Sequence, residues 1–267
     1  MVVTGLRMRV EIDMGRNGRI SLAVATVVCL WACATSAQTG GRPIRAVLAV
    51  GRVASMVDKP VELKLSRVSI PASASANYLG DHSVIYVVSG ALAVTSGNQS
   101  QSVQQGDGAY IPSNTEATLQ AGPNAPAEIL QFQLVATSNS ADPTLGAPAV
   151  ETVLRRMAIP RNTLKPGPYE FSLARATLPA GATGPKPHTR SGAALYYVLA
   201  EGMITMWPAA TIDALSGESR TELRPAGAIQ EEPFGFIHTW IPKSDSALVM
   251  LQANVNQEGV TDIIFVK

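Results

Sequence analysis

Apolar and polar residues alternate in several short stretches of this chain. The segments VELKL (61–65) and LQFQL (130–134) place an apolar residue at every second position. A period of two is typical of β-strands in a sheet that is buried on one face. Longer β-rich runs at 84–94 and 195–207 each contain a glycine near the middle, which predicts a hairpin or a bend. A long helical period is absent after the first forty residues, and 151–157 is the best candidate for a short helix.

The strand-like segments recur in the same order in two parts of the chain. SRVSIP at 66–71 recurs as ARATLP at 174–179, and IYVVSG at 85–90 recurs as YYVLAEG at 196–202. Insertions between the matched blocks fall where loops are expected, and loops tolerate insertions. The pattern therefore predicts a duplicated all-β protein whose two units resemble sandwiches or barrels.

The composition of the segment between the repeats sets the expected domain boundaries. It is polar and rich in proline, glycine and serine, as linkers are. We expect a first unit at 41–137, a linker at 138–149 and a second unit at 150–267. Each unit has about the length of an ordinary small domain.

The first 37 residues have the order of a secretory signal peptide. Arg16 and Arg19 precede an uncharged, mostly apolar stretch at 20–34, and small residues follow before Gln38. That stretch is short for a membrane span, so we expect cleavage and a mature chain without a transmembrane segment. The expected location is the periplasm or the exterior of the cell.

Two details of this segment leave alternatives. Met14 is the better start on physical grounds, because the residues before it carry two acids and resemble an overcalled leader. The segment ending at Cys33 resembles a bacterial lipobox, which would attach a lipid. Trp31 is too bulky for that pattern, so we favour cleavage.

Composition and charge narrow the class of partner. Lys and Arg number 21 against 20 Asp and Glu, for a net charge of +1, and charged residues make up 15% of the chain. Without a basic excess, a nucleic-acid partner is not indicated, and a small molecule is the expected ligand. The two cysteines, Cys29 and Cys33, cannot form a four-cysteine zinc site.

Two motifs in the second unit resemble those of a known family. GAIQEEPFGFIH at 227–238 fits G-x5-P-x-G-x2-H, the second motif of the cupin superfamily, and PHTRSG at 187–192 resembles the first. Because the first unit repeats the same frame, the mature chain resembles a secreted bacterial bicupin. The resemblance implies two tandem double-stranded β-helices, which are jelly-roll barrels, each able to hold a site.

The resemblance also implies where metal ligands would lie. His188 and His238 occupy the first and last histidine positions of the motifs, whereas Arg190 stands at the second histidine position and Ala194 at the glutamate position. A divalent metal such as Zn, Mn or Fe would therefore have two of its usual four ligands. An arginine has no lone pair with which to replace a third.

The first unit has lost the motif more completely. Ala117 stands at the last histidine position, and Ser83 at the glutamate position. His82 lies one residue away from that position and is interpreted as a surface or loop residue. We interpret the first unit as a structural or dimerising unit. If it dimerises, the protein forms a homodimer.

Two adjacent glutamates add candidate chemistry to the second unit. Glu231 and Glu232 lie in one strand, so their side chains point to opposite faces and one of them is expected inside the barrel. That carboxylate could complete a two-histidine, one-carboxylate metal set or pair with Arg190. Solvation of both acids at a wide barrel mouth is the third reading.

Two classes of function follow for the second unit. The first is a non-catalytic barrel in which Arg190, Tyr196 and Trp240, together with the two histidines, bind a small anionic molecule. The second is an enzyme in which His188, His238, Glu231 and Glu232 are the candidate catalytic groups. For a metal-dependent cupin, the resemblance allows dioxygenase, decarboxylase or isomerase chemistry, and without metal a histidine could act as general base. Residues such as Tyr196 and Trp240 are more often core or rim residues than ligand contacts.

Overall fold

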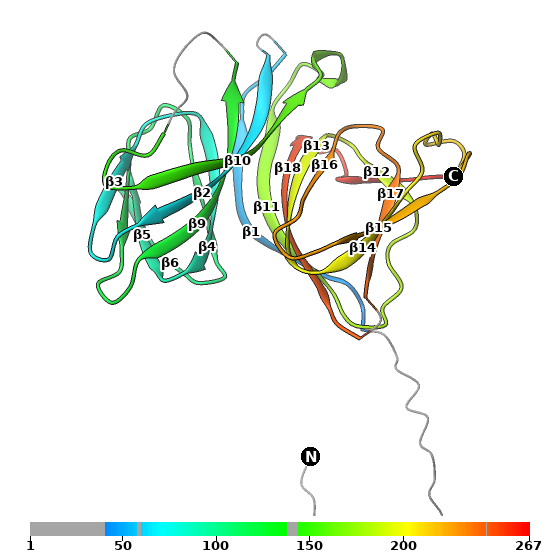
Figure 1. The fold of residues 1–267 in the computed structure, drawn as a ribbon. Coiled ribbons are helices and arrows are strands. Elements are labelled where there is room, and N and C mark those ends of the chain that lie inside the picture. Colours follow the sequence, from blue (N-terminus) through cyan, green and yellow to red (C-terminus); the bar gives the residue numbers. More distant parts are fainter. Residues whose placement is uncertain (1–40, 58–59, 138–143, 244) are drawn as a thin grey trace, which may run out of the picture. The chain divides into compact units, whose positions relative to one another are not determined.

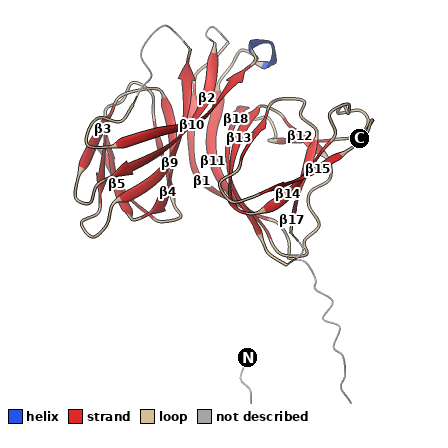
Figure 2. Ribbon diagram, viewed as in Figure 1, coloured by secondary structure: helices blue, strands red, loops and turns tan. Residues whose placement is uncertain are grey.

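The computed structural model describes residues 41–57, 60–137, 144–243 and 245–267. The expected signal peptide at 1–37 and most of the expected linker, 138–143, lie outside the described residues. The described chain is built almost entirely of strands, with one single-turn 3-10 helix, η1 (Arg161–Thr163) (Figure 2). No helix of the described part is long and apolar enough to cross a membrane.

The first barrel consists of two sheets joined through an apolar core. Its strands are β2 (Val61–Ile70), β3 (Ser75–Tyr78), β4 (His82–Ser89), β5 (Ala91–Ser96), β6 (Gln99–Gln104), β7 (Gly108–Ile111), β8 (Ala117–Ala121), β9 (Ala127–Ala136) and β10 (Val150–Ile159). The sheet β10-β2-β9-β4-β7 packs against the sheet β3-β8-β5-β6. Residues from both sheets, among them Ile70, Ile85 and Leu119, fill the space between them.

The second barrel repeats this arrangement. Its strands are β1 (Ile44–Val53), β11 (Tyr169–Leu178), β12 (His188–Arg190), β13 (Ala193–Ala200), β14 (Gly202–Met206), β15 (Arg220–Arg224), β16 (Ile229–Glu232), β17 (His238–Pro242), β18 (Leu248–Gln257) and β19 (Ile263–Phe265). The sheets run β1-β11-β18-β13-β16 and β15-β14-β17-β12-β19. Apart from β19, which extends the second sheet beyond β12, the strand order matches that of the first barrel. The predicted all-β fold class with two tandem jelly rolls is confirmed.

The two barrels exchange their outermost strands. β1 precedes the first barrel in sequence but pairs with β11 of the second, from Val53 opposite Tyr169 to Ile44 opposite Thr177. β10 follows the linker but pairs with β2 of the first barrel. Figure 1 shows β1 beside β11 of the second barrel and β10 beside β2 of the first. The expected boundaries at 41–137 and 150–267 therefore do not coincide with membership of the sheets.

The expected short helix at 151–157 is wrong, because this segment forms most of β10. Val153, Leu154 and Met157 follow a helical spacing, but ladder bonds to β2 satisfy the backbone of this segment instead. One apolar core lies between the sheet β10-β2-β9-β4-β7 of the first barrel and the sheet β1-β11-β18-β13-β16 of the second. It contains Leu63 and Phe132 from the first sheet and Phe171 and Leu251 from the second. The barrels are thus held together by shared strands and by a shared core.

A glycine allows β1 to cross close to the first barrel. A Cβ atom on Gly51 would lie 1.9 Å from Cζ of Tyr110, which is far below van der Waals contact. The Tyr110 hydroxyl in turn donates a 3.3 Å hydrogen bond to the carbonyl of Arg52. A side chain at position 51 would therefore force the Tyr110 ring away from β1.

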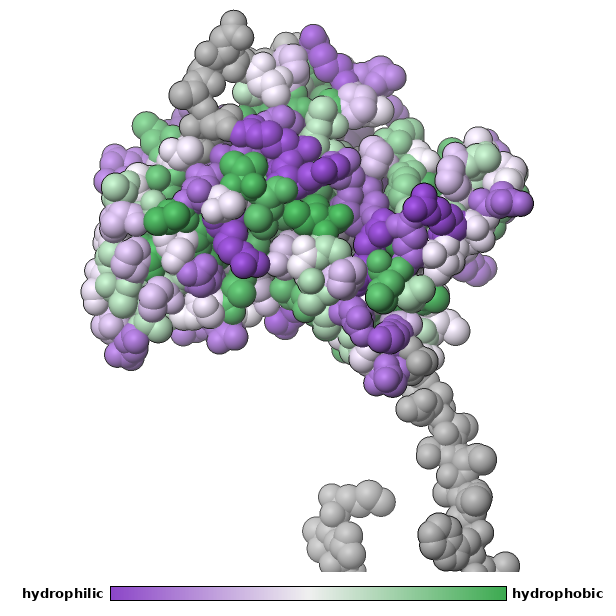
Figure 3. Space-filling view, viewed as in Figure 1, coloured by the Kyte–Doolittle hydropathy of each residue, from purple (hydrophilic) through white to green (hydrophobic). Residues whose placement is uncertain are grey.

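The exchanged strands also carry apolar side chains on the surface. Val47 and Val50 of β1 and Val150 and Val153 of β10 are about half exposed or more. Figure 3 shows apolar residues near the centre of one face of the molecule. Both strands lie at the edges of their sheets, where a row of backbone groups is unpaired.

Candidate functional site

The two histidines of the motifs meet inside the second barrel. His188 on β12 and His238 on β17 are directly opposite partners in the antiparallel pairing. Their ring centroids are 4.6 Å apart, and the residues are 1% and 0% exposed. The pairing of β12 with β17 thus brings together two residues that are fifty positions apart.

Each histidine ring is fixed by a carbonyl of its own chain segment. Nδ1 of His188 lies 2.8 Å from the carbonyl oxygen of Lys186, and Nδ1 of His238 lies 3.1 Å from that of Phe236. A carbonyl can only accept, so Nδ1 carries a proton in both rings, and Nε2 of the neutral His188 ring carries the lone pair. Burial, together with the neighbouring His238 ring, lowers the pKa of His188 to about 4, so this ring is neutral near pH 7.

The two adjacent glutamates separate as strand geometry requires. The Glu232 side chain is fully buried inside the barrel, opposite Ala194 of β13. Glu231 points the other way and forms an ion pair with Arg155 of β10, in which both side chains are partly exposed. Of the four candidate catalytic residues, the structure brings His188, His238 and Glu232 together and leaves Glu231 outside.

The Glu232 carboxylate is surrounded by N–H groups. Oε1 accepts a 2.8 Å hydrogen bond from the Trp240 indole and lies 2.9 Å from Nε2 of His238. Oε2 accepts from Nε of Arg190 at 3.3 Å. Burial alone would raise the pKa of Glu232, but His238, Arg190 and Trp240 more than offset it, and the pKa falls to about 2. Glu232 is therefore ionised across the physiological range.

Arg190 is buried beside this carboxylate but is only partly satisfied. The residue is 3% exposed, and its guanidinium carbon lies 5.3 Å from the centre of the Tyr196 ring, which gives a cation–π contact. Its Nη1 atom is buried without a hydrogen-bond partner among the described residues. Burial of the Tyr196 hydroxyl raises its pKa, and that ring stacks on Trp240 at 6.3 Å. The predicted binding residues Arg190, Tyr196 and Trp240 thus lie in one cluster.

A cavity of about 150 Å³ adjoins the cluster. His188, Arg190 and Trp240 line it together with Gln252, and apolar side chains such as Leu178, Met250 and Ile263 form most of the remaining wall. Residues 43–45, at the start of β1, close another part of the wall. The exchanged strand is therefore part of the site.

No protein-family profile matches the sequence, and no curated protein matches it. Solved structures do match. A mutant of Bacillus subtilis oxalate decarboxylase is 15% identical, with a TM-score of 0.56 over 76% of this chain and 71% of that one. A second structure of the Bacillus subtilis enzyme, from a study of its Mn(II) centres, is 13% identical, with a TM-score of 0.55 over 83% of this chain and 79% of that one.

The chain shares the two-barrel cupin fold of these structures. At these identities the likeness shows the fold alone, and the Mn(II) centres belong to the oxalate decarboxylase. The resemblance seen in the two motifs is thereby confirmed at the level of fold.

The donor set of this bicupin does not fit a metal centre of the usual cupin kind. Both oxygens of Glu232 already accept N–H groups, from Trp240 and from Arg190. Arg190 places a permanent positive charge at the second histidine position of the motif. Within the described ranges, no group of three or more His, Cys, Asp or Glu side chains is arranged to hold a metal ion.

The first barrel of the bicupin contains buried polar residues that the sequence pattern did not reveal. Lys64 is fully buried and pairs with Glu151 of β10 at 2.9 Å, and Ser66 donates to the same carboxylate at 2.6 Å. Gln131 and Gln133 are also fully buried. The alternation in 61–65 predicts burial of one face, whereas both faces of β2 are covered. This burial depends on the pairing of β2 with β10, a long-range contact that the local pattern does not encode.

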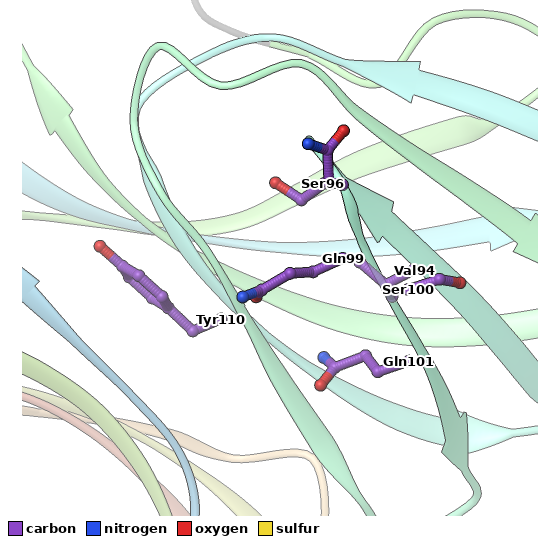
Figure 4. Close-up of a pocket in the computed structure, with 7 residues that line it drawn as sticks. Val94, Ser96, Gln99, Ser100, Gln101 and Tyr110 are labelled. Carbon is purple, nitrogen blue, oxygen red and sulfur yellow. The ribbon is translucent and has the colours of Figure 1, made fainter.

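Other parts of the first barrel carry fewer signs of a site. Figure 4 shows an open pocket of about 470 Å³, lined by neutral residues of β5 and β6 and by Tyr110. His82, predicted to be a surface or loop residue, begins β4, is half-buried and contacts the Tyr110 and Ser113 hydroxyls. Backbone N–H of Ser113 also points at its Nδ1 atom. These partners hold the ring in place within the first barrel.

Proposed function

We propose that the second barrel of this bicupin binds a small organic anion, whose carboxylate accepts hydrogen bonds from Arg190. The observation that carries the proposal is the buried guanidinium whose Nη1 atom has no partner among the described residues. The cavity of about 150 Å³ reaches this residue.

The hydrogen-bond inventory of Arg190 supports an anionic ligand. A guanidinium carries five N–H donors in a planar fork, and a single long hydrogen bond of 3.3 Å joins Arg190 to Glu232. A buried donor without an acceptor costs about 1–3 kcal/mol, and more when it is charged. A carboxylate can accept two parallel hydrogen bonds from the fork, so binding would remove this cost.

The cavity limits the size of the ligand. Its volume corresponds to roughly five water molecules in the liquid, which is enough for a short carboxylic acid and too little for a sugar. The mostly apolar wall favours a short alkyl group on the acid. A small monocarboxylate such as propionate is therefore a suitable probe.

Calorimetric titration with propionate tests the proposal. We expect the wild-type protein to bind propionate and Arg190→Gln to lose at least tenfold in affinity, with Arg190→Lys intermediate because it keeps the charge but not the fork. Arg155→Gln is the matched control, since it removes an arginine from an exposed ion pair with a glutamate. Equal binding by the Arg190 and Arg155 variants would contradict the proposal.

A metal-dependent enzyme is the alternative function. The observation in its favour is that His188 keeps Nε2 free of a proton, as metal-binding histidines do when Nδ1 donates to a carbonyl. Metal analysis of the purified protein after dialysis decides between the two. A stoichiometric divalent metal that is lost in His188→Ala would overturn the anion-binding proposal.

We further propose that the protein acts outside the cytoplasm, on the strength of the charge and hydropathy order in residues 1–37. Mass spectrometry of protein from the extracytoplasmic fraction should find a chain that begins near Gln38. An intact terminus at Met1 or Met14 in that fraction would refute this.

A further inference from the structure

We infer that the ligand of the second barrel is a short hydroxycarboxylate, which offers both an acceptor for Arg190 and a hydroxyl donor for His188. The inference rests on the proposed function of the same cavity and adds the class of ligand. Its basis is that Nη1 of Arg190 is buried without a partner among the described residues, and that His188, whose Nδ1 is held by a carbonyl, lines the same cavity.

His188 can serve only as an acceptor toward the cavity. Its Nδ1 proton is held by the carbonyl of Lys186 at 2.8 Å, so Nε2 carries a lone pair. Among the described residues, no donor occupies that atom.

The second histidine does not compete for the same ligand group. Nε2 of His238 lies 2.9 Å from the Glu232 carboxylate, which can only accept, so this atom donates to Glu232 and offers the ligand no lone pair. His238 does not line the cavity, whereas His188 and Arg190 both do. On β12 the ligand therefore meets one donor group, Arg190, and one acceptor group, His188.

The backbone places the two groups within reach of one small molecule. His188 and Arg190 are two positions apart on β12, so their side chains leave the strand on the same face. Residues at this spacing are about 7 Å apart along a strand, which matches the span of a molecule with a few heavy atoms between its two ends. A carboxylate on Arg190 thus leaves a neighbouring hydroxyl near His188.

The same arrangement disfavours two related classes of acid. A simple alkyl acid leaves Nε2 of His188 without a donor in a dry cavity. A 2-oxo acid is worse, because its carbonyl oxygen brings a second lone pair toward Nε2. The expected order of affinity is lactate, then propionate, then pyruvate.

Calorimetric titrations of the purified protein with these three acids test the inference near pH 7. One neutral hydrogen bond corresponds to roughly fivefold in affinity, so lactate should bind about fivefold or more tightly than propionate. His188→Phe keeps an aromatic ring without nitrogen, and should lose the preference for lactate while retaining propionate binding. His188→Asn, which keeps an acceptor, guards against a folding defect and should retain part of the preference.

The outcomes separate the inference from the proposed function. If lactate and propionate bind equally and Arg190→Gln weakens both, the hydroxycarboxylate is refuted and the anion-binding proposal stands. If none of the acids binds, or if Arg190→Gln leaves binding unchanged, the proposed function itself is overturned. A lactate preference that survives in His188→Phe also refutes the role of His188.

Discussion

Glu231 and Glu232 provide a matched pair of substitutions at adjacent positions. Glu232 is fully buried and contacts Arg190, His238 and Trp240. The Glu231 side chain is about one third exposed and pairs with a more exposed arginine on β10. Changing each to glutamine removes the same charge and preserves nearly the same volume, so the difference between the two variants reports the environment alone.

The structure gives very different magnitudes for the two changes. Removing one partner of a buried ion pair leaves the other charge uncompensated and costs about 3–5 kcal/mol, which is the expected effect of Glu232→Gln. The fall in the pKa of Glu232 from 4.5 to about 2 corresponds to roughly 3 kcal/mol in favour of the ionised form, which agrees with that range. An exposed ion pair contributes about 0–1 kcal/mol, which is the expected effect of Glu231→Gln.

Equilibrium urea denaturation near pH 7 measures both variants. Trp240, which donates to Glu232, supplies a fluorescence signal, and far-UV circular dichroism checks that the two probes report one transition. A double variant, Glu232→Gln with Arg190→Met, should recover much of the loss, because it removes both buried charges. Equal midpoints for Glu231→Gln and Glu232→Gln would refute the reasoning, since the inward carboxylate would then have no energetic role.

Three further predictions follow from the folded chain. The pKa of His188 in the folded protein is lowered from 6.5 to about 4. The contribution of this residue to the free energy of unfolding should therefore be fully present above pH 6.5 and fall toward pH 4 by up to about 1.4 kcal/mol per pH unit. His188→Asn should flatten this slope when urea midpoints are measured across the same pH range. Gly51→Ala should lower the free energy of unfolding by about 1–3 kcal/mol, because the added methyl group displaces Tyr110. Gly122→Ala is the control: its Cβ would meet its nearest atom at 3.5 Å, so this variant should melt near the wild-type temperature. The isolated fragment 150–267 should lack cooperative thermal unfolding by circular dichroism, because it loses β1 and half of the shared core; a cooperative transition would contradict this.

The sequence by itself determined the class of fold and singled out the residues of the candidate site. Alternation of apolar residues is a local property, so it predicts strands wherever a chain pairs them. The repeated blocks predicted the duplication, and the two barrels do share a strand order. Motif spacing singled out His188 and His238, which the pairing of β12 with β17 brings together. It also singled out Arg190, because an arginine at a histidine position stands out in the motif.

The tertiary structure decided what depends on contacts between distant segments. The exchange of β1 and β10 links residues that are 81 to 133 positions apart, and no local pattern encodes which barrel a strand joins. The same exchange made 151–157 a strand and buried Lys64 against Glu151. Strand geometry required that one of the two glutamates face inward, but only the register of β16 against β13 selected Glu232. Local propensity differs by about 1 kcal/mol or less between such alternatives, whereas long-range pairing and burial contribute several times more, and they determine the outcome.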